Sequence, residues 1–314
     1  MPARTKTSSR RDRRRLKKKE GQPKKSWKML KIAVFLLLPI SLFVLVFGTT
    51  KFWDGKHKLA IVLSGGGEDV DVAVFDPTAA TLTVINIPGS TEVDVARNFG
   101  RWRLKSVVKL GEKEDLEGAL LAETLTRHFR FPVFAWGQDG AKGFMEGDLP
   151  NLLRATFTPY KTNLGIGDRV RLMYFGLTVK NSKKVQIRLA ETRYLKKTTL
   201  SDGEEGFELS GNITASLAAV FSEPDFTYES GRTKIIDRTG VGTGKLLAQS
   251  AEVLGLKVVS INNEQSQESD CLVAGKEIKS AVLVSRLFGC EMLVDDDLDL
   301  DLVITVGKDF AKRF

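Results

Sequence analysis

One uncharged apolar run, Ile32–Thr50, constrains this 314-residue chain more than any other feature. As an α-helix its nineteen residues would span about 28 Å, close to the roughly 30 Å hydrocarbon core of a bilayer. Pro39 lies inside the run, and membrane helices tolerate such a proline. A buried core helix is an alternative, but it rarely contains so few polar residues. The run therefore predicts a single transmembrane anchor at residues 32–50.

The basic charge of the chain is concentrated before this run. Residues 1–31 contain 14 of the 48 Lys and Arg residues and two acids, Asp12 and Glu20, so their formal charge is +12. The formal charge of the whole chain is +9, so the other 283 residues sum to −3. Dense positive charge beside an anchor places the N-terminus in the cytoplasm and the following domains outside the cell. We interpret the tail as a segment attracted to anionic lipid rather than a nucleic-acid patch, because the folded part lacks the excess basic charge.

A cleaved signal peptide is the main rival to an anchor. Val46–Gly48 loosely fits a cleavage site, but the basic region and the apolar run are both longer than in a typical signal peptide. These lengths favour an uncleaved signal-anchor, and cleavage after Gly48 stays open.

Beyond the anchor the sequence predicts an α/β protein. Its length suggests two domains, and regular strand–helix alternation begins at Arg232. Apolar periodicity predicts helices at Glu114–Phe129, Asn212–Phe221 and Lys276–Phe288. Asn212 also begins a formal glycosylation sequon, which the predicted helix Asn212–Phe221 would include.

Several apparent motifs fail on their spacing. The turn Gly240–Lys245 stands where phosphate loops stand, but it lacks the first glycine and the Ser/Thr of a Walker A motif. The acidic run Asp295–Asp301 lacks the glycine and glutamate of an EF-hand. His57 and His128 have no metal-ligand partners at suitable spacing, so we expect structural or surface roles for both.

Four basic residues come after the predicted strand that ends at Pro88: Arg97, Arg101, Arg103 and Lys105. Guanidinium groups bind phosphate oxygens in a bidentate way, so this basic group could hold a pyrophosphate. A solvated basic face is the alternative, and we favour it because a run of charge is weak evidence by itself.

The two cysteines, Cys271 and Cys290, are candidates for a disulfide. Cys271 opens a predicted strand, and the helix that follows should return the chain to the end where that strand starts. Cys290 comes directly after this helix, so the two sulfur atoms could meet. Two buried thiols are the alternative, and the expected extracellular location favours the disulfide slightly.

The sequence beyond the anchor resembles the LytR-CpsA-Psr family of cell-envelope proteins. The first part of the resemblance comprises the strands Ala60–Ser64 and Val70–Phe75, the segment Val84–Pro88, and the helix Leu116–Phe129 with Pro132-Val133 after it. The second part resembles the family's C-terminal accessory domain, through Ile235–Val241, Leu247-Ala248 and Asp301–Phe310. We therefore predict a tail (1–31), an anchor (32–50), a linker (51–56), a divergent family-like α/β/α domain (57–222), a second linker (223–231) and a small α/β domain similar to the LytR C-terminal domain (232–314).

The resemblance implies transfer of a polyprenyl-pyrophosphate-linked glycopolymer to peptidoglycan, with a divalent metal such as magnesium. Family members bind the phosphates through Asp and several Arg residues. Here Pro88-Gly89-Ser90-Thr91 stands where the family has Pro-Arg-Asp-Thr. Of the family's Arg-x-Asp only Asp69 remains, as a candidate metal ligand, and no late Arg-rich stretch is found between residues 180 and 222.

These departures favour an envelope protein that binds wall glycopolymer, its lipid-linked precursor or envelope partners with little or no catalysis. The loss of one transition-state donor typically costs a factor of about 10²–10³ in rate, and several are missing. The alternative is an active phosphotransferase in which Arg101 and Arg103 replace the missing arginines. Convergence of these two side chains with Asp69 in one pocket would favour the alternative.

Overall fold

The computed structural model describes residues 31, 35, 51–64, 68–229, 232–275, 279–295, 298 and 300–314. The chain divides into two compact units, Met1–Thr49 and Thr50–Phe314, and the elements below belong to the second unit. Apart from Phe35, the predicted anchor lies outside the described residues. Within the described part of the chain, no helix combines the length and the apolar character that a membrane crossing requires.

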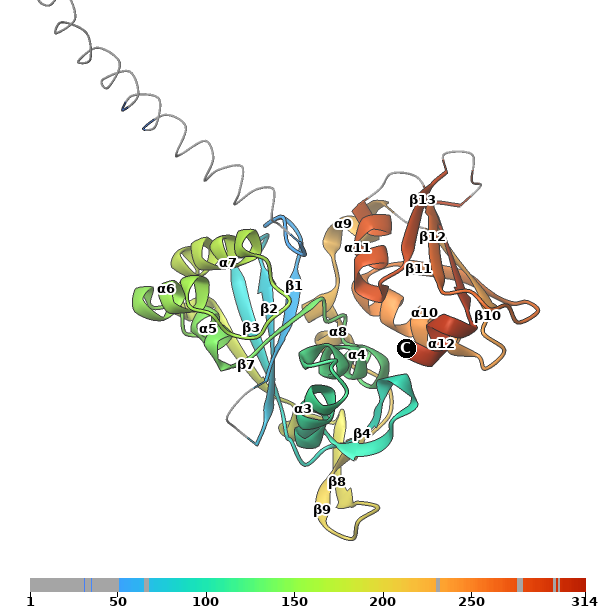
Figure 1. Cartoon of the computed structure of the whole chain (residues 1–314), viewed down its shortest axis with the longest axis horizontal. Coiled ribbons are helices and arrows are strands. Elements are labelled where there is room, and N and C mark those ends of the chain that lie inside the picture. Colours follow the sequence, from blue (N-terminus) through green and yellow to red (C-terminus); the bar gives the residue numbers. More distant parts are fainter. Residues whose placement is uncertain are drawn as a thin grey trace, which may run out of the picture. The chain divides into compact units, whose positions relative to one another are not determined.

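The first sheet has five strands in the order β6-β1-β2-β3-β7 (Figure 1). β1, β2 and β3 form an antiparallel meander, β6 lies parallel to β1, and β7 lies parallel to β3. The strand bounds are β1 Leu59–Leu63, β2 Val70–Asp76, β3 Thr81–Ile87, β6 Ala135–Gly137 and β7 Lys184–Arg188. The strands expected at Ala60–Ser64 and Val70–Phe75 agree with β1 and β2 to within one residue.

Helices cover both faces of this sheet (Figure 1). In β1, Leu59 and Ile61 pack in one hydrophobic core with Leu172 of α7, whereas Ala60 and Val62 pack in another core. The first layer comprises α5 Gly143–Glu146, α6 Leu149–Phe157 and α7 Ile166–Thr178. The opposite layer comprises α3 Leu104–Lys113 and α4 Gly118–His128. Because successive strand residues point to opposite faces, both faces of β1 are buried, and the predicted α/β class is confirmed.

The second sheet is also mixed, with the order β11-β10-β14-β12-β13. Its strands are β10 Arg232–Arg238, β11 Lys257–Asn263, β12 Cys271–Gly275, β13 Glu291–Val294 and β14 Leu302–Gly307. Its helices are α10 Thr243–Leu254, α11 Lys279–Phe288 and α12 Lys308–Arg313. α10 ends at Gly255, whose φ of 109° suits the left-handed termination expected of glycine.

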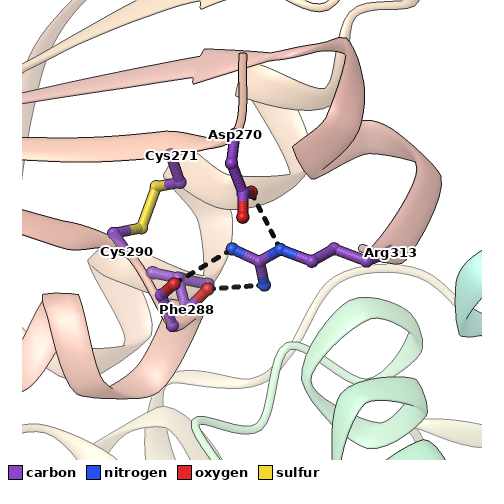
Figure 2. Close-up of a disulfide and its surroundings, with 6 residues drawn as sticks. Asp270, Cys271, Phe288, Cys290 and Arg313 are labelled. Atoms are coloured by element: carbon purple, nitrogen blue, oxygen red, sulfur yellow. Dashed lines mark hydrogen bonds and ion pairs between the residues drawn. A yellow bond between two sulfur atoms is a disulfide. The ribbon is translucent and has the colours of Figure 1, made fainter.

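A disulfide joins Cys271, at the start of β12, to Cys290, directly before β13 (Figure 2). Their Cα atoms lie 4.6 Å apart, within the range that disulfides require. The guanidinium of Arg313 lies beside the bridge, where its Nε donates to Asp270 Oδ1 at 2.9 Å and its Nη1 donates to the Phe288 carbonyl at 2.8 Å. The end of α12 is therefore held against the residues that flank the bridge.

A buried carboxylate fixes the start of the second unit. Asp168, in the first turn of α7, accepts hydrogen bonds from the backbone N–H groups of Lys51, Phe52, Trp53 and Gly165, at 2.9–3.2 Å. Where water is excluded, these hydrogen bonds satisfy both the carboxylate and the N–H groups, which would otherwise lack partners. The segment directly after the predicted anchor is thereby tied to α7.

Smaller elements complete the unit. The hairpins are β4 Glu92–Val95 with β5 Gly100–Arg103, and β8 Leu195–Thr199 with β9 Glu205–Leu209. The short helices are α8 Ala215–Phe221 and α9 Pro224–Glu229. The 3-10 turns are η1 Ala96–Asn98, η2 Asp139–Lys142, η3 Asn181–Lys183 and η4 Leu189–Glu191.

Two predicted helix starts were wrong. The helix expected from Glu114 begins at Gly118, because Asp115 and Glu117 adopt positive φ angles of 56° and 49°. The helix expected from Asn212 begins at Ala215, and Thr214 caps it through a hydrogen bond from Leu217 N, so the sequon precedes the helix. The segment expected as a linker from residue 223 contains α9.

Candidate functional site

The first candidate site lies at the end of the first sheet where β2 begins and β3 ends. Val70 and Ile87 pair there across the antiparallel strands, which brings Asp69 to the turn after β3. Asp69 Oδ1 accepts a hydrogen bond from Gly89 N at 3.1 Å, and Gly89 O accepts one from Lys105 N at 3.0 Å. Asp69, Gly89 and the start of α3 therefore meet at this edge, which we call the sheet-end turn.

Gly89 leaves no space for a side chain at the sheet-end turn. A Cβ atom at this position would lie 1.6 Å from the carbonyl oxygen of Glu68 and 2.9 Å from the Cβ atom of Lys105. Such distances require the backbone to move, since the nearest atom belongs to the main chain. Gly89, which the sequence resemblance aligns with an arginine of the LytR-CpsA-Psr family, is thus enclosed by the backbone, and the turn is not shaped to receive an arginine.

The four members of the basic group each have an acidic partner. Arg97 Nε lies 2.6 Å from Glu123 Oε2, and a second bond from its Nη2 makes this pair bidentate. The other pairs are Arg101–Glu92 at 3.5 Å, Arg103–Asp202 at 2.7 Å, Arg103–Glu204 at 2.8 Å and Lys105–Glu68 at 3.8 Å. The hydrogen bond from Arg97 to Glu123 raises the pKa of Arg97. The basic group is therefore electrically balanced rather than a concentrated positive surface.

Arg101 and Arg103 lie on β5, opposite the acids of β4. The register pairs Arg101 with Asp94 and Arg103 with Glu92. A cavity of about 230 Å³ lies at Arg101, and the described residues that line it are Glu92, Val93, Asp94, Arg101, His128, Glu208 and Leu209. Arg103 and Asp69 are not among them. Three acids line this cavity against one arginine, so it does not suit the phosphates of the active-enzyme alternative.

The residues at the sheet-end turn do not fit a magnesium site. Hard divalent cations require several oxygen ligands, and Asp69 supplies a single carboxylate that already accepts the Gly89 N–H. In the part of the chain that the structure describes, no three His, Cys, Asp or Glu residues form a group that could hold a metal ion.

The glycine-rich turn before α10 is occupied by a carboxylate of the chain itself. Asp237 Oδ2 accepts a hydrogen bond from Gly244 N at 2.7 Å, and Asp237 Oδ1 accepts one from Thr239 N at 2.8 Å. An anion at this helix N-terminus is favourable, and Asp237 already supplies it. The turn therefore does not serve as a phosphate loop, in agreement with its failed motif.

A second candidate site is a cavity of about 380 Å³ beside the C-terminal end of α4. α10 contacts both α4 and α8 in this region (Figure 1). The lining residues are His128, Arg130, Tyr194, Leu209, Gly211, Asn212, Ile213, Ala218, Gln249, Glu252 and Val253. We call it the Arg130 cavity. Its volume lies within the range of small-molecule sites, and its wall mixes apolar and polar side chains.

Arg130 differs from the basic group in its partners. Its Nε donates to Gln249 Oε1 at 2.8 Å and its Nη1 donates to the His128 carbonyl at 3.4 Å. None of the carboxylates that the structure describes forms an ion pair with it. Burial lowers the pKa of Arg130, as expected for a cation with too little compensating negative charge.

His128 lines both the Arg130 cavity and the smaller cavity at Arg101. Its Nδ1 accepts a hydrogen bond from Asp94 N at 3.2 Å, which assigns the proton of the neutral ring to Nε2. Nε2 is buried and has no hydrogen-bond partner among the described residues. Burial lowers the pKa of His128 to about 4, so the ring is neutral at physiological pH.

The sequence contained no signal for this second cavity. Arg130 lies between Phe129 and Phe131 at the end of a predicted helix, and its partner Gln249 is 119 residues away. The expectation that His128 is structural or surface-exposed missed its place on two cavity walls.

No family model matches the sequence, and no curated protein matches it. Solved structures do match it in part. TagV of B. subtilis is 13% identical over 52% of this chain and 94% of its own, with a TM-score of 0.39. A LytR-CPS2A-psr family protein, YwtF (TagT) with bound octaprenyl pyrophosphate lipid, is 14% identical over 51% and 87%, with a TM-score of 0.35. EF0465 of Enterococcus faecalis, described as a transcriptional regulator, is 11% identical over 64% and 89%, with a TM-score of 0.37.

Structures of LytR-CPS2A-psr family proteins thus match about half of the chain. Because these TM-scores lie below 0.5, the matches carry no argument about function.

Proposed function

We propose that this chain is a single-pass envelope protein that binds a wall glycopolymer, or its polyprenyl-pyrophosphate-linked precursor, without transferring it to peptidoglycan. The anchor at residues 32–50 would hold it in the membrane, with the second unit outside the cell. The ligand class comes from the resemblance of the sequence to the LytR-CpsA-Psr family.

The enclosure of Gly89 is the observation that carries the non-catalytic part of this proposal. Phosphoryl transfer depends on cations that neutralise charge in the transition state. At the sheet-end turn the backbone of Glu68 occupies the space that an arginine side chain would need. Arg101 and Arg103 do not replace it, because acids of β4 and of the segment between β8 and β9 pair with them.

The test uses the full-length protein in detergent micelles with a polyprenyl-pyrophosphate-linked glycopolymer and isolated peptidoglycan. We expect the precursor to bind, with no polymer attached to peptidoglycan whether magnesium is present or chelated. Attachment that requires magnesium and is lost in Arg103→Ala, but not in the control Arg188→Ala, would establish the active phosphotransferase instead. Arg188 suits the control because, within the described residues, it forms an ion pair with the nearby exposed Glu191 alone.

The topology is tested separately on intact cells. External protease should digest the second unit and spare the basic residues 1–31. Protection of residues 232–314 would contradict the proposed orientation.

A further inference from the structure

We propose that the Arg130 cavity binds a small polyhydroxy ligand that carries an anionic oxygen group, a carboxylate or a phosphate, and that Arg130 is the residue that receives this group. This proposal does not depend on the envelope function above, since the cavity and the sheet-end turn share no residue.

The first support is the missing counter-charge of Arg130. A half-buried guanidinium is costly unless hydrogen bonds and an opposite charge compensate for its loss of water. Arg130 has hydrogen bonds to two neutral oxygens, Gln249 Oε1 and the His128 carbonyl, and no ion pair with any described carboxylate. Glu252 also lines the cavity without forming such a pair. An anionic ligand would supply the missing charge.

The second support is the way in which Arg130 is held. Its φ angle is 61°, in the left-handed region that a residue with a long side chain seldom adopts. The bond to Gln249 engages Nε, which fixes the plane of the guanidinium before a ligand arrives. Because Gln249 fixes the guanidinium plane, little side-chain freedom is lost when an anion binds, whereas the φ angle is shared with the ion-paired Arg97.

The third support is the chemistry of the remaining wall. Asn212, Gln249 and Glu252 carry hydrogen-bonding groups, whereas Leu209, Ile213 and Val253 supply apolar surface. Side chains of these two kinds suit a sugar ring, which has hydroxyl groups at its rim and C–H groups on its faces. The buried Nε2 of His128 is a further donor without a partner among the described residues.

The experiment measures binding of three probes to the full-length protein in detergent micelles by isothermal titration calorimetry. The probes are glucuronate, which carries a carboxylate, glucose 6-phosphate, which carries a phosphate, and glucose, which is uncharged. We expect at least one anionic probe to bind about ten-fold or more tightly than glucose, since a charge-assisted bidentate bond adds that much. The anionic probe that binds identifies the group.

Variants assign the effect to Arg130. Arg130→Asn, which tolerates a positive φ, should weaken the anionic probe about ten-fold and leave glucose unchanged. Gln249→Ala should weaken it by a smaller factor, about three-fold, and also serves if Arg130→Asn does not fold. Arg188→Asn is the control and should change nothing. Equal binding of glucose and both anions, no binding of any probe, or unchanged anion binding in both cavity variants would overturn the proposal.

Discussion

Arg97 and Arg130 share a backbone conformation and differ in their surroundings. Both have a φ angle of 61°; Arg97 lies on η1 and pairs with Glu123 of α4, and Arg130 lies just beyond His128, the last residue of α4. Arg97 forms two hydrogen bonds with Glu123, at 2.6 and 2.7 Å, whereas Arg130 contacts an amide and a backbone carbonyl. The first arginine is satisfied within the chain, and the second lacks an anion.

This contrast separates structural from ligand-binding arginines. A guanidinium with a bidentate carboxylate has its charge balanced and its donors used, so it has little left to offer a phosphate. A half-buried guanidinium without an acid retains its full attraction for an anion and lowers the stability of the free protein. The same criterion assigns the basic group to structure, and it assigns Arg130 to binding.

The largest expected effect concerns the closure of the sheet-end turn. Gly89→Ala places a Cβ atom 1.6 Å from the Glu68 oxygen, so the turn must rearrange, and we expect a loss of more than about 4 kcal/mol in the free energy of unfolding. Urea denaturation followed by circular dichroism measures this loss.

Gly203→Ala is the matched control for Gly89→Ala. Its φ is 84°, and nothing lies within 4 Å of the added Cβ, so only backbone strain of about 1–2 kcal/mol is expected. If the two variants have equal unfolding midpoints, the sheet-end turn is open enough for a side chain, and the non-catalytic proposal loses its support.

The second prediction concerns the disulfide in the second sheet. α10 packs against this sheet and also lines the Arg130 cavity. The bridge joins residues that are 19 positions apart, so its reduction should lower the free energy of unfolding by about 3 kcal/mol in the chain-entropy model. Hydrogen exchange should accelerate in α11 and β13 on reduction, with little change in β2 and β3. Two free thiols per chain in the unfolded, unreduced protein would contradict the bridge itself.

The third prediction uses two buried groups whose titrations oppose each other. Burial raises the pKa of Glu223 from 4.5 to about 7, so its contribution to stability is present below pH 4.5 and is lost as the pH rises through 7. Burial lowers the pKa of His128 from 6.5 to about 4, so its contribution is present above pH 6.5 and is lost as the pH falls through 4.

Between pH 4.5 and 6.5 the two contributions change with opposite sign, and the wild-type stability should vary little. Glu223→Gln should leave a protein that loses about 1–3 kcal/mol on acidification from pH 6.5. His128→Asn, in which the amide can replace Nδ1, should instead lose stability as the pH rises towards 7. Urea midpoints at pH 4.5, 5.5, 6.5 and 7.5 test this, and parallel pH profiles in both variants would show that neither group is buried as described.

Sequence reasoning succeeded where local pattern decides the structure. The strand expected at Val70–Phe75 is β2 to within one residue, and the strand–helix alternation expected from Arg232 is present. It failed where the backbone departs from its propensity: acids at residues 114–117 resembled a helix start, but Asp115 and Glu117 form a turn with positive φ.

The candidate sites depended on contacts that no local pattern encodes. Arg103 is neutralised by Asp202, 99 positions along the chain, on the turn between β8 and β9. The glycine at position 89 could be read from the sequence, whereas its enclosure by the Glu68 carbonyl required the fold. Arg130 became visible as a candidate only when α4 and α10 were placed together.

The smallest expected effect returns to the two arginines with the same φ angle. Arg97→Asn removes a part-exposed bidentate pair, and it should lower the free energy of unfolding by about 0.5–1 kcal/mol. Arg130→Asn removes an unbalanced charge and should leave that free energy unchanged or raise it by a similar amount. Asparagine tolerates the left-handed region at both positions, so backbone strain cancels from the comparison. Thermal midpoints of the two variants, measured without ligand, decide the matter. Equal losses in both would mean that Arg130 stabilises the fold as Arg97 does, and its assignment to a ligand would then need a different basis from its missing counter-charge.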